Sequence, residues 1–444
     1  MANTYITRTN GSAATNHDKA TISFWLKRCR GGVEESVFGA YVDDNNRFKF
    51  RFRSDDKFDF ELGVGSSWYS LISNQKFRDR TGWMHFVIAY DSSQGTDSER
   101  TKIYVNGTQV TDLGTANYVP QNQDFYFTKN GVGITIGDNY QGGSHQNYFD
   151  GLISHFHCVD GLALTPNYFG QTDTTSGEWK LGGNQGAITY GNNGFFILKD
   201  SASLTDQSGN TNNWSSGGGN LNNTIDNPSD NFCTWNGNSK IDNGSTSYGL
   251  TRITGDTNDA YSSNAVGSIA AAKGKYYCEV KYTSANPSNN NPCLGIVNMD
   301  APYEYNVNIT TSTNGYINFR FTGDLKVNNV ETTGWDTAIT SAGTIIMMAM
   351  DLDNWKWYIG TNGTWYNSAN PSSGTNGVSI SPQSGYWSWN CRHLGATFDA
   401  NFGNGFFGTT AISSAGTNAS NIGSFEYDVP TGFTALSTKG INSF

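Results

Sequence analysis

Two acidic residues, Asp59 and Glu61, stand two positions apart in the stretch FDFELG. In an extended strand such residues point to the same face, so their carboxyl groups would lie side by side. Two carboxyl groups that flank a glycosidic bond are the acid and the nucleophile of many sugar-cleaving enzymes. The pair is therefore the first candidate catalytic site, and a glycanase is the enzyme it would imply.

The residues around this pair support a structural interpretation. Phenylalanine alternates with basic residues before Ser54 and with acidic residues after Lys57, which predicts a β-hairpin that turns between them. Opposed residues of an antiparallel pair share a face, so an odd-length loop would bring charge against opposite charge. We favour this ladder of solvated ion pairs over catalysis. It has two open registers: Arg53/Asp59 with Arg51/Glu61, or Arg51/Asp59 with Lys49/Glu61.

The composition is that of an all-β protein. Only 15% of the residues are charged and 14% are aromatic, while Gly, Ser, Thr and Asn fill the gaps between short β-branched and aromatic runs. The 444 residues allow two to three domains at about 150 residues each. The net charge of −10 argues against nucleic acid and anionic membranes as partners, because both require a basic surface.

The sequence shows no export signal, no membrane-spanning segment and no cysteine motif for binding a metal. The N-terminal stretch has no apolar core, and the longest apolar run, 345–350, is too short to cross a bilayer. We therefore expect a soluble chain without an export signal and without membrane insertion. The six cysteines form no C-x-x-C pair and are widely dispersed, which favours buried free thiols over disulfides.

Strand signals fill the first third of the chain. They are TISFWLKR (21–28), WMHFVIAYD (83–91), KIYVNGTQV (102–110) around an Asn-Gly turn, GVGITIGD (131–138) and FDGLISHFHCVDGLAL (149–164). The last four, in this order, resemble the laminin-G-like branch of the concanavalin A-like sandwich. The run LTPNYFGQTDTTSGEWKL (164–181), followed by 190–214, is similar to the laminin-G-type domain of tailed-phage structural proteins. The resemblance covers about residues 1–235.

A polar Gly/Asn/Ser stretch, 209–231, is the best candidate for a domain boundary. Beyond it, GKYYCEV (274–280), MDLDNWKWYIGTNG (350–363) and ATFDANFG (396–403) resemble a SPRY-type sandwich, from which a tryptophan-rich insertion near 384–393 departs. The sequence thus predicts an all-β chain of two antiparallel β-sandwich, jelly-roll-like domains in series. The predicted parts are a laminin-G-like sandwich (1–190), a closing and linking segment (191–235), a SPRY-like sandwich (236–411) and a C-terminal extension (412–444).

Candidate metal ligands are few. His155 and His157 share a strand face, but no third ligand is identifiable, so polar residues on an outer face are the plainer interpretation. Asp351, Asp353 and Asn354 resemble the start of a calcium-binding loop. However, the sixth position of that loop is Lys356 and not glycine, and the twelfth is Asn362 and not glutamate, so we predict a hairpin turn. The laminin-G resemblance implies one structural calcium ion at the sandwich rim. Its candidate ligands are Asp138, Asn139 and Asp150, and no other cofactor is expected.

Aromatic side chains are the remaining candidates for binding. Flat rings flanked by Asn and Ser suit sugars, because rings stack on C–H faces while amides bind hydroxyls. Trp357 shares a strand face with Ile359 and is expected in the core, and tryptophans near strand ends are also common packing caps. The candidate ligand-binding residues are Trp365, Tyr366, Trp387 and Trp389 in the second domain, and Trp68, Tyr69, Tyr140 and His145 in the first.

Catalytic motifs are missing from the sequence. It contains no nucleophile elbow, phosphate-binding loop or dinucleotide fingerprint, and no E-x-D-x-E strand of the kind expected of a glycanase on this sandwich. The resemblance implies a non-enzymatic virion protein of a tailed bacteriophage, namely a tail fibre or appendage that binds host-surface glycan. The alternative is a head decoration or head-fibre protein that docks on other virion subunits, and a polysaccharide depolymerase is third. The implied location is the virion, assembled in the host cytoplasm, where avidity favours a homo-oligomer.

Overall fold

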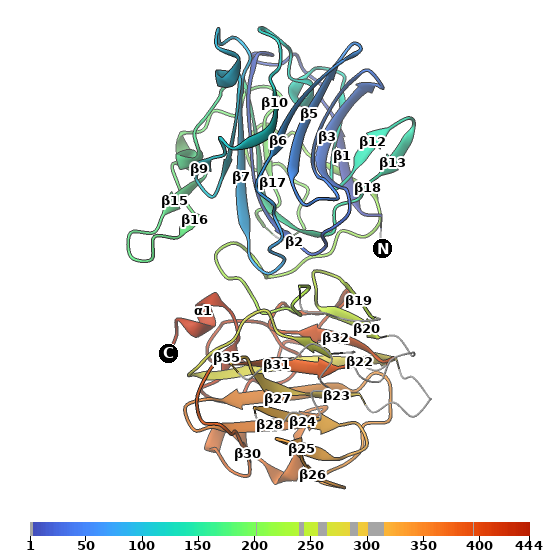
Figure 1. The fold of residues 1–444 in the computed structure, drawn as a ribbon, viewed down its shortest axis with the longest axis vertical. Coiled ribbons are helices and arrows are strands. Elements are labelled where there is room, and N and C mark those ends of the chain that lie inside the picture. The colour runs from blue at the N-terminus through green and yellow to red at the C-terminus, as the bar shows by residue number, and fades with distance from the viewer. Residues whose placement is uncertain are drawn as a thin grey trace. The chain divides into compact units, whose positions relative to one another are not determined.

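The computed structural model describes residues 3–200, 202–238, 244–255, 264–284, 292–300, 315–393 and 395–444. The chain divides into two compact units, Met1–Asn223 and Thr224–Phe444, and the division falls inside the predicted linking segment (Figure 1). Both units consist almost entirely of β-sheets, which confirms the predicted all-β class.

Helices are short throughout the described residues. The single α-helix there is α1 (Thr438–Ile441), and none of the helices is long and apolar enough to cross a membrane. Within the same described residues, six 3-10 helices join strands: η1 (Asp97–Glu99), η2 (Tyr126–Thr128), η3 (Pro166–Tyr168), η4 (Gln185–Ala187), η5 (Tyr366–Ser368) and η6 (Pro371–Ser373).

Unit 1 is a sandwich of two antiparallel sheets around one apolar core. The first sheet has eight strands, in the order β10 (Leu113–Asn117), β6 (Ser67–Ser73), β5 (Phe58–Val64), β4 (Asn46–Phe52), β3 (Glu35–Asp43), β11 (Gly133–Ile136), β1 (Tyr5–Thr9) and β18 (Ser215–Gly218). The second has six, in the order β17 (Phe195–Ile197), β14 (Gly151–Asp160), β2 (Lys19–Arg28), β7 (Met84–Asp91), β8 (Thr101–Val105) and β9 (Thr108–Gln109). Two small hairpins complete the unit: β12 (Asn139–Gln141) with β13 (Ser144–Gln146), and β15 (Gly170–Thr172) with β16 (Trp179–Leu181).

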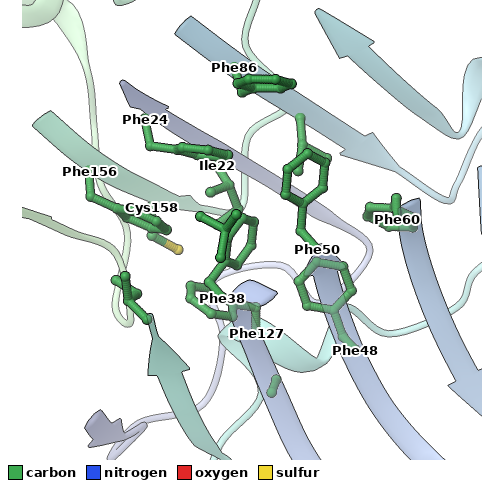
Figure 2. Packing of buried hydrophobic residues seen from close by; sticks show 14 of the residues in the cluster. Ile22, Phe24, Phe38, Phe48, Phe50, Phe60, Phe86, Phe127, Phe156 and Cys158 are labelled. Carbon is green, nitrogen blue, oxygen red and sulfur yellow. The ribbon is translucent and has the colours of Figure 1, made fainter. Parts of the chain in front are cut away.

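Phenylalanine fills the space between these two sheets (Figure 2). Every second residue of β2, β4 and β5 points inward, as the sequence alternation predicts. The rings of Phe24, Phe50 and Phe86 meet with centroids 5.6 to 5.7 Å apart. Burying one such ring contributes about 1.5–3 kcal/mol, so this alternation is what fixes which face of each strand is outside.

The register of the β4–β5 hairpin is the second of the two predicted alternatives. Arg51 lies opposite Asp59 and Lys49 opposite Glu61, while the main-chain N–H of Arg53 donates to the carbonyl of Lys57 at 2.8 Å and closes the turn. The other register is wrong. The centre of the turn therefore lies at residue 55, one position earlier than that register requires.

The strand signals of the first third are confirmed. The five stretches lie on β2, β7, β8–β9, β11 and β14. Asn106 and Gly107 join β8 to β9 with φ of 48° and 80°, which are the positive angles of a two-residue hairpin turn.

Unit 2 is a second sandwich with its own core. The first sheet has nine strands: β19 (Gly244–Ser247), β20 (Arg252–Gly255), β32 (Thr397–Asn401), β22 (Lys275–Ser284), β27 (Ile345–Asp351), β28 (Lys356–Thr361) and β29 (Thr364–Trp365) in order, with β30 (Val378–Ser379) on β28 and β35 (Thr434–Ala435) on β22. The second has six, in the order β21 (Asn264–Val266), β31 (Trp387–Arg392), β23 (Cys293–Asn298), β24 (Tyr316–Arg320), β25 (Leu325–Val327) and β26 (Val330–Thr332). A small hairpin pairs β33 (Phe406–Phe407) with β34 (Thr410–Ala411).

The segment predicted as a C-terminal extension packs on the outer face of the nine-stranded sheet. Phe425 and Phe433 from this segment form an apolar cluster with Tyr277 of β22 and Tyr358 of β28. Asn354 donates its main-chain N–H to Asp351 at 2.9 Å between β27 and β28, so the predicted hairpin turn is confirmed there. All six cysteines are buried, as expected.

Candidate functional site

A pocket of about 190 Å³ opens on the outer face of the eight-stranded sheet of unit 1. Its floor is formed by three adjacent strands, β1, β11 and β3. Its walls are aromatic and come partly from the small β12–β13 hairpin. The lining residues are Thr7, Gly39, Ala40, Tyr41, Gly133, Thr135, Tyr140 and His145.

Strand register explains why this part of the sheet is hollow. Thr7 lies opposite Thr135, and Thr135 lies opposite Gly39, so these residues form one rung on the outer face. The isoleucines that alternate with them, among them Ile134, point into the core. Gly39 and Gly133 carry no side chain, and a Cβ added to Gly133 would meet no atom within 4 Å. The sheet therefore leaves open space above it at this position.

The β12–β13 hairpin supplies two of the aromatic walls. Tyr140 lies opposite His145, and the turn consists of Gly142 and Gly143 with φ of 58° and 78°. The Tyr140 ring meets the Tyr41 ring edge-on, with centroids 5.0 Å apart at 84°. The main-chain N–H of Gly142 donates to Asp44 Oδ1 at 3.1 Å. The hairpin is thereby fastened to the β3 side of the pocket.

A buried carboxylate holds the other wall. Asp138, which is 0% exposed, bonds the Nδ1 atom of His145 through its Oδ2 atom. The His145 ring also stacks on Tyr5 with centroids 3.9 Å apart. Burial raises the pKa of the Asp138 carboxyl, while its hydrogen bond with His145 lowers it. Among the described residues, none forms a hydrogen bond with the other ring nitrogen, Nε2.

The hydroxyl groups of the floor already have acceptors. Thr7 donates to the carbonyl of Ile134 at 3.2 Å, and Thr135 donates to the carbonyl of Asp138 at 3.4 Å. Their oxygen lone pairs can still accept hydrogen bonds from a ligand. None of the described residues that line the pocket carries a carboxylate. The pocket thus combines aromatic faces with hydrogen-bond acceptors.

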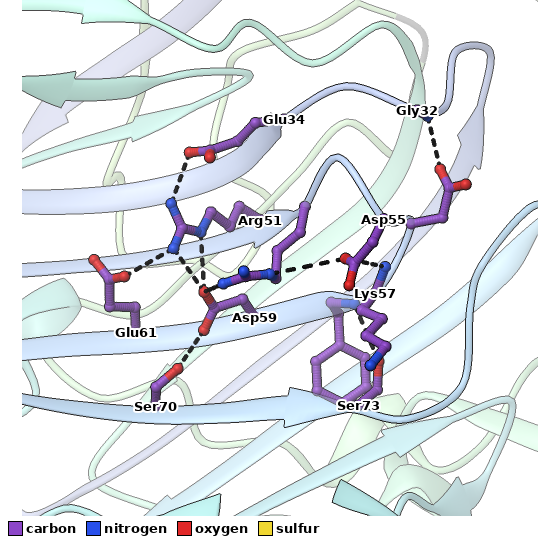
Figure 3. Close-up of polar contacts among 12 residues, drawn as sticks. Gly32, Glu34, Arg51, Asp55, Lys57, Asp59, Glu61, Ser70 and Ser73 are labelled. Carbon is purple, nitrogen blue, oxygen red and sulfur yellow. Dashed lines mark hydrogen bonds and ion pairs between the residues drawn. The ribbon is translucent and has the colours of Figure 1, made fainter. Parts of the chain in front are cut away.

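The first candidate catalytic pair is part of an ion-pair network (Figure 3). The Arg51 guanidinium lies 2.7 Å from Asp59 and 2.9 Å from Glu61, and Lys49 lies 3.1 Å from Glu61. Ser70 donates to the second oxygen of Asp59 at 2.6 Å. Asp59 is also buried. Both carboxylates are occupied by cations, so neither is placed to protonate a glycosidic oxygen.

The four predicted binding residues of unit 1 lie in three different places. Tyr140 and His145 line it, whereas Tyr69 packs against the core. Trp68 is 38% exposed, and its ring lies 4.4 Å from the Arg47 guanidinium. Arg47 is opposite Tyr41 in the sheet, so the Trp68 ring extends the same face beyond the pocket. The role of the four residues in ligand binding stays a prediction.

The expected exposure of the unit 2 aromatics is wrong for most of them. Trp387 and Trp389 are 0% exposed, because they lie on the inward face of β31 and not in a loop. Tyr366 is also in the core, and Trp365 is half-buried against Tyr277 and Tyr358. Trp357 is buried in the core, as predicted.

The candidate calcium ligands do not form one ligand set. Asp138 bonds His145, Asn139 donates a side-chain N–H to Gln141 at 3.4 Å, and Asp150 donates its main-chain N–H to Glu35 at 3.1 Å. The histidine on Asp138 disfavours a calcium ion, which takes oxygen ligands. Over the described ranges, one group of potential metal ligands lies close enough together, and it consists of His17, Asp18 and Asp124 at the surface.

The two histidines of β14 are held in different ways. His155 has φ of 49° at a β-bulge and bonds Ser154 at 2.7 Å. His157 is 1% exposed, bonds the Tyr190 hydroxyl at 2.8 Å and stacks on Phe196. Both rings contact Phe196, and Phe156 and Cys158 point into the core, so the two histidines lie on the outer face as expected, where the chain around Tyr190 covers His157.

Sequence reasoning missed most of the pocket. Thr7, Tyr41 and Thr135 come from separate strands, and only the sheet order brings them together. One signal was available for the hairpin: Gly142-Gly143 between two polar and aromatic pairs is a typical two-residue hairpin turn. That signal places Tyr140 opposite His145 but does not show what they face.

Residues 1–167 match the family model described as the concanavalin A-like lectin/glucanases superfamily. Unit 1 therefore has a concanavalin A-like jelly-roll fold. Among solved structures, the SPRY domain of human HERC1 is similar with 16% identity and a TM-score of 0.27, over 34% of this chain and 87% of that one.

Two further similar structures contain sugars. One is domain 4 of the arabinanase AbnA from Geobacillus stearothermophilus in complex with arabinotriose, with 19% identity and a TM-score of 0.27, over 34% of this chain and 64% of that one. The other is the CBM40 of the Ruminococcus gnavus IT-sialidase bound to α2,3-sialyllactose, with 15% identity and a TM-score of 0.25, over 34% of this chain and 86% of that one. No curated protein matches the sequence.

Proposed function

We propose that this chain is a non-enzymatic, lectin-like protein that binds a saccharide in the pocket between the β12–β13 hairpin and the eight-stranded sheet. The observation that carries the proposal is the set of three aromatic walls, Tyr41, Tyr140 and His145, around a glycine-containing floor. Sugar rings present C–H faces that stack on aromatic rings, while their hydroxyls need polar partners at the edge. The pocket offers both.

The size of the pocket supports a small ligand unit. Its volume of about 190 Å³ is below the roughly 300–1,000 Å³ of pockets for drug-sized ligands. One sugar unit would fill it, and the remainder of a glycan would lie on the neighbouring face near Arg47 and Trp68. The matched family is described as lectins as well as glucanases, which agrees with sugar recognition on this fold.

The surrounding chemistry favours binding over cleavage. Glycoside hydrolysis typically uses two carboxyl groups that flank the scissile bond, and none of the described lining residues of this pocket carries one. Thr7 and Thr135 donate their hydroxyl protons to main-chain carbonyls, so neither is hydrogen-bonded to His145 as an activated nucleophile would be. The Asp59 and Glu61 carboxylates are neutralised by Arg51.

The biological setting that we propose is a tailed-phage appendage that recognises host-surface glycan. It rests on the resemblance of residues 164–181 and 190–214 to the laminin-G-type domain of tailed-phage structural proteins, together with the proposed pocket. Single-sugar sites bind weakly, so several copies on one particle would be needed for avidity. Immunogold labelling of intact particles tests this setting: gold on the tail is expected, whereas gold over the head would favour a decoration protein that docks on other virion subunits.

Filling the pocket tests the binding site itself. Gly133→Val adds carbon atoms to open space on a strand that tolerates valine, so the fold should persist while the ligand is excluded. Gly95→Val is the matched control, because a Cβ there also meets no atom within 4 Å and Gly95 lies outside the pocket lining. On an array of bacterial and neutral glycans, wild type and Gly95→Val should bind the same glycans and Gly133→Val none. A wild-type chain that binds no glycan would remove the proposal.

An enzyme assay tests the third alternative, in which the protein is a polysaccharide depolymerase. Any glycan bound on the array is incubated with the protein, and new reducing ends are measured. We expect none. Release of reducing ends that Gly133→Val abolishes would make the pocket a catalytic site, and the chain a depolymerase.

A further inference from the structure

We infer that Asp138 is a positioning residue that fixes His145 with its Nε2 atom as a hydrogen-bond acceptor, so that the pocket selects neutral, hydroxyl-bearing sugars over anionic ones. This inference rests on the proposed function and names the ligand class of the same pocket. It also assigns to Asp138 a role other than the calcium ligand that the sequence suggested.

The first step is the fixed orientation of the imidazole. Gly137 and Asp138 connect β11 to the β12–β13 hairpin. Gly137 has a φ of 97°, which turns the chain at this connection. The carboxylate is fully buried and bonds Nδ1 of His145, while Tyr5 stacks on the ring from one side. The Tyr148 hydroxyl donates to the His145 carbonyl at 3.3 Å. The ring thus has contacts that hold its position and its rotation.

The second step is the placement of the proton. An ionised carboxylate can only accept hydrogen bonds, so the His145 proton must lie on Nδ1. In a neutral imidazole the other nitrogen, Nε2, then carries the lone pair and accepts. The same logic orients metal-bound and catalytic histidines through a carboxylate behind the ring. Here the bond orients a ring that lines a pocket.

The third step is the pattern of partners that the pocket presents. The Thr7 and Thr135 hydroxyls donate to main-chain carbonyls, so they face a ligand as acceptors, like Nε2. The nearby cations already have partners: Lys49 lies 3.1 Å from Glu61, and Arg47 donates to the Asp44 carbonyl at 2.6 Å and lies 3.9 Å from the Asp44 carboxylate. A group that donates protons suits this set, and a carboxylate, sulfate or phosphate does not. Sugar hydroxyls are such donors.

The experiment has a readout that needs no ligand. Two-bond 15N–1H correlation spectra of the imidazole rings distinguish the Nδ1–H from the Nε2–H tautomer, and a His145→Gln variant assigns the signal. At pH 7.5 we expect the Nδ1–H form for His145. In Asp138→Asn the amide can donate to Nδ1, so the ring should change to the Nε2–H form, as an Asp→Asn change does behind a catalytic histidine. An Nε2–H tautomer in the wild type would overturn the inference.

The second readout is affinity for a neutral and an anionic sugar of the same backbone. Wild type should bind the neutral sugar, and Asp138→Asn should bind it about tenfold or more weakly, because an acceptor has become a donor. Asp55→Asn is the control, since this exposed carboxylate lies in the β4–β5 turn and its loss should leave affinity unchanged. Preference for the anionic sugar, or equal affinity of Asp138→Asn and wild type, would contradict the inference and leave the proposed function standing. A chain that binds neither sugar contradicts both.

Discussion

The Glu279 carboxylate of β22 accepts the main-chain N–H of Tyr427 at 2.8 Å, across 148 residues of sequence. It accepts the N–H of Glu426 at the same distance, and the Tyr277 hydroxyl donates to it at 3.0 Å. No salt bridge to Glu279 occurs in the described part of the chain. The C-terminal segment is therefore anchored on a buried carboxylate without a counter-ion.

This anchor predicts a pH-dependent attachment of the C-terminal segment. Burial raises the pKa of Glu279 to about 7, against 4.5 for the ordinary group, while its hydrogen bonds lower it. The folded state then holds a proton that the unfolded state has lost, so stability is full below pH 4.5 and falls as the pH rises to 7, by about 1.4 kcal/mol per pH unit. Hydrogen exchange of the Glu426 and Tyr427 amides, corrected for the intrinsic rate, should show more opening at pH 8 than at pH 5.5. Glu279→Gln should remove the difference and Glu331→Gln should keep it; equal opening at both pH values in wild type would refute the anchor.

Unit 1 should respond to pH in the opposite direction. His85 lies between Ser23 at 2.8 Å and Trp179 at 2.9 Å, and burial lowers its pKa to about 3. Burial likewise lowers the pKa of His155 to about 4. Because the unfolded groups take up protons near pH 6.5, stability is full above that value and is lost toward pH 4, by about 1.4 kcal/mol per pH unit for each histidine. Calorimetry of the chain at pH 5 and pH 7 should show one transition that moves down on acidification. His85→Asn should reduce that shift, and an unchanged shift would show that other groups cause it.

Asp59→Asn should weaken the fold and leave ligand affinity intact. The change removes one of three carboxylates around Arg51, at a group that is 1% exposed, and weakening its buried hydrogen bonds costs about 1–3 kcal/mol. Urea unfolding measures the loss of stability, and titration with the array ligand measures affinity. Glu61→Gln is the comparison, with a smaller loss expected because Glu61 is more exposed. A loss of binding by folded Asp59→Asn would place this network in the site.

Trp68→Ala should affect long ligands only. Its exposed ring lies beside Arg47 on the same face as the pocket but is not part of the lining. A ring that stacks on a second sugar unit adds about 0.5–1.5 kcal/mol, so affinity for an oligosaccharide should fall several-fold while affinity for the single sugar stays the same. Tyr69→Phe is the control, because this neighbouring ring packs on the core; it should change neither the affinity for the single sugar nor the affinity for the oligosaccharide. Equal losses for the single sugar and the oligosaccharide would contradict this assignment.

Trp387→Ala should destabilise unit 2 without changing binding. The side chain is 0% exposed in the core, and deletion of a buried tryptophan costs about 3–5 kcal/mol. Thermal unfolding and the glycan array together decide the outcome. A stable variant that loses glycan binding would restore the original expectation of an exposed binding residue.

Local pattern predicted the parts of the fold that neighbouring residues determine. The alternation around Asp59 and Glu61 identified the hairpin and its ion pairs, because period-two burial and opposite charges act between adjacent strands. The Asn-Gly turn at 106 and 107 was found for the same reason. The choice of register was not determined, since both alternatives neutralise the carboxylates.

Properties that depend on distant contacts were not predictable in the same way. Trp387 and Trp389 alternate with Ser388 as in a strand, but their Gly/Ser flanks suggested a loop, and only packing decides that they are buried. The pocket floor requires β1, β11 and β3 to be neighbours, although β3 ends at Asp43 and β11 begins only at Gly133. Tyr140 and His145 were found because they share one hairpin.

The measurement that tests the central claim most directly is a calorimetric titration of wild type, Gly133→Val and Gly95→Val with the neutral glycan selected on the array. The proposed pocket predicts binding by wild type and Gly95→Val with the same affinity, and no heat of binding for Gly133→Val, because valine occupies the space above the floor. Binding of equal strength by Gly133→Val would contradict the account, since the glycan would then be held elsewhere on the chain.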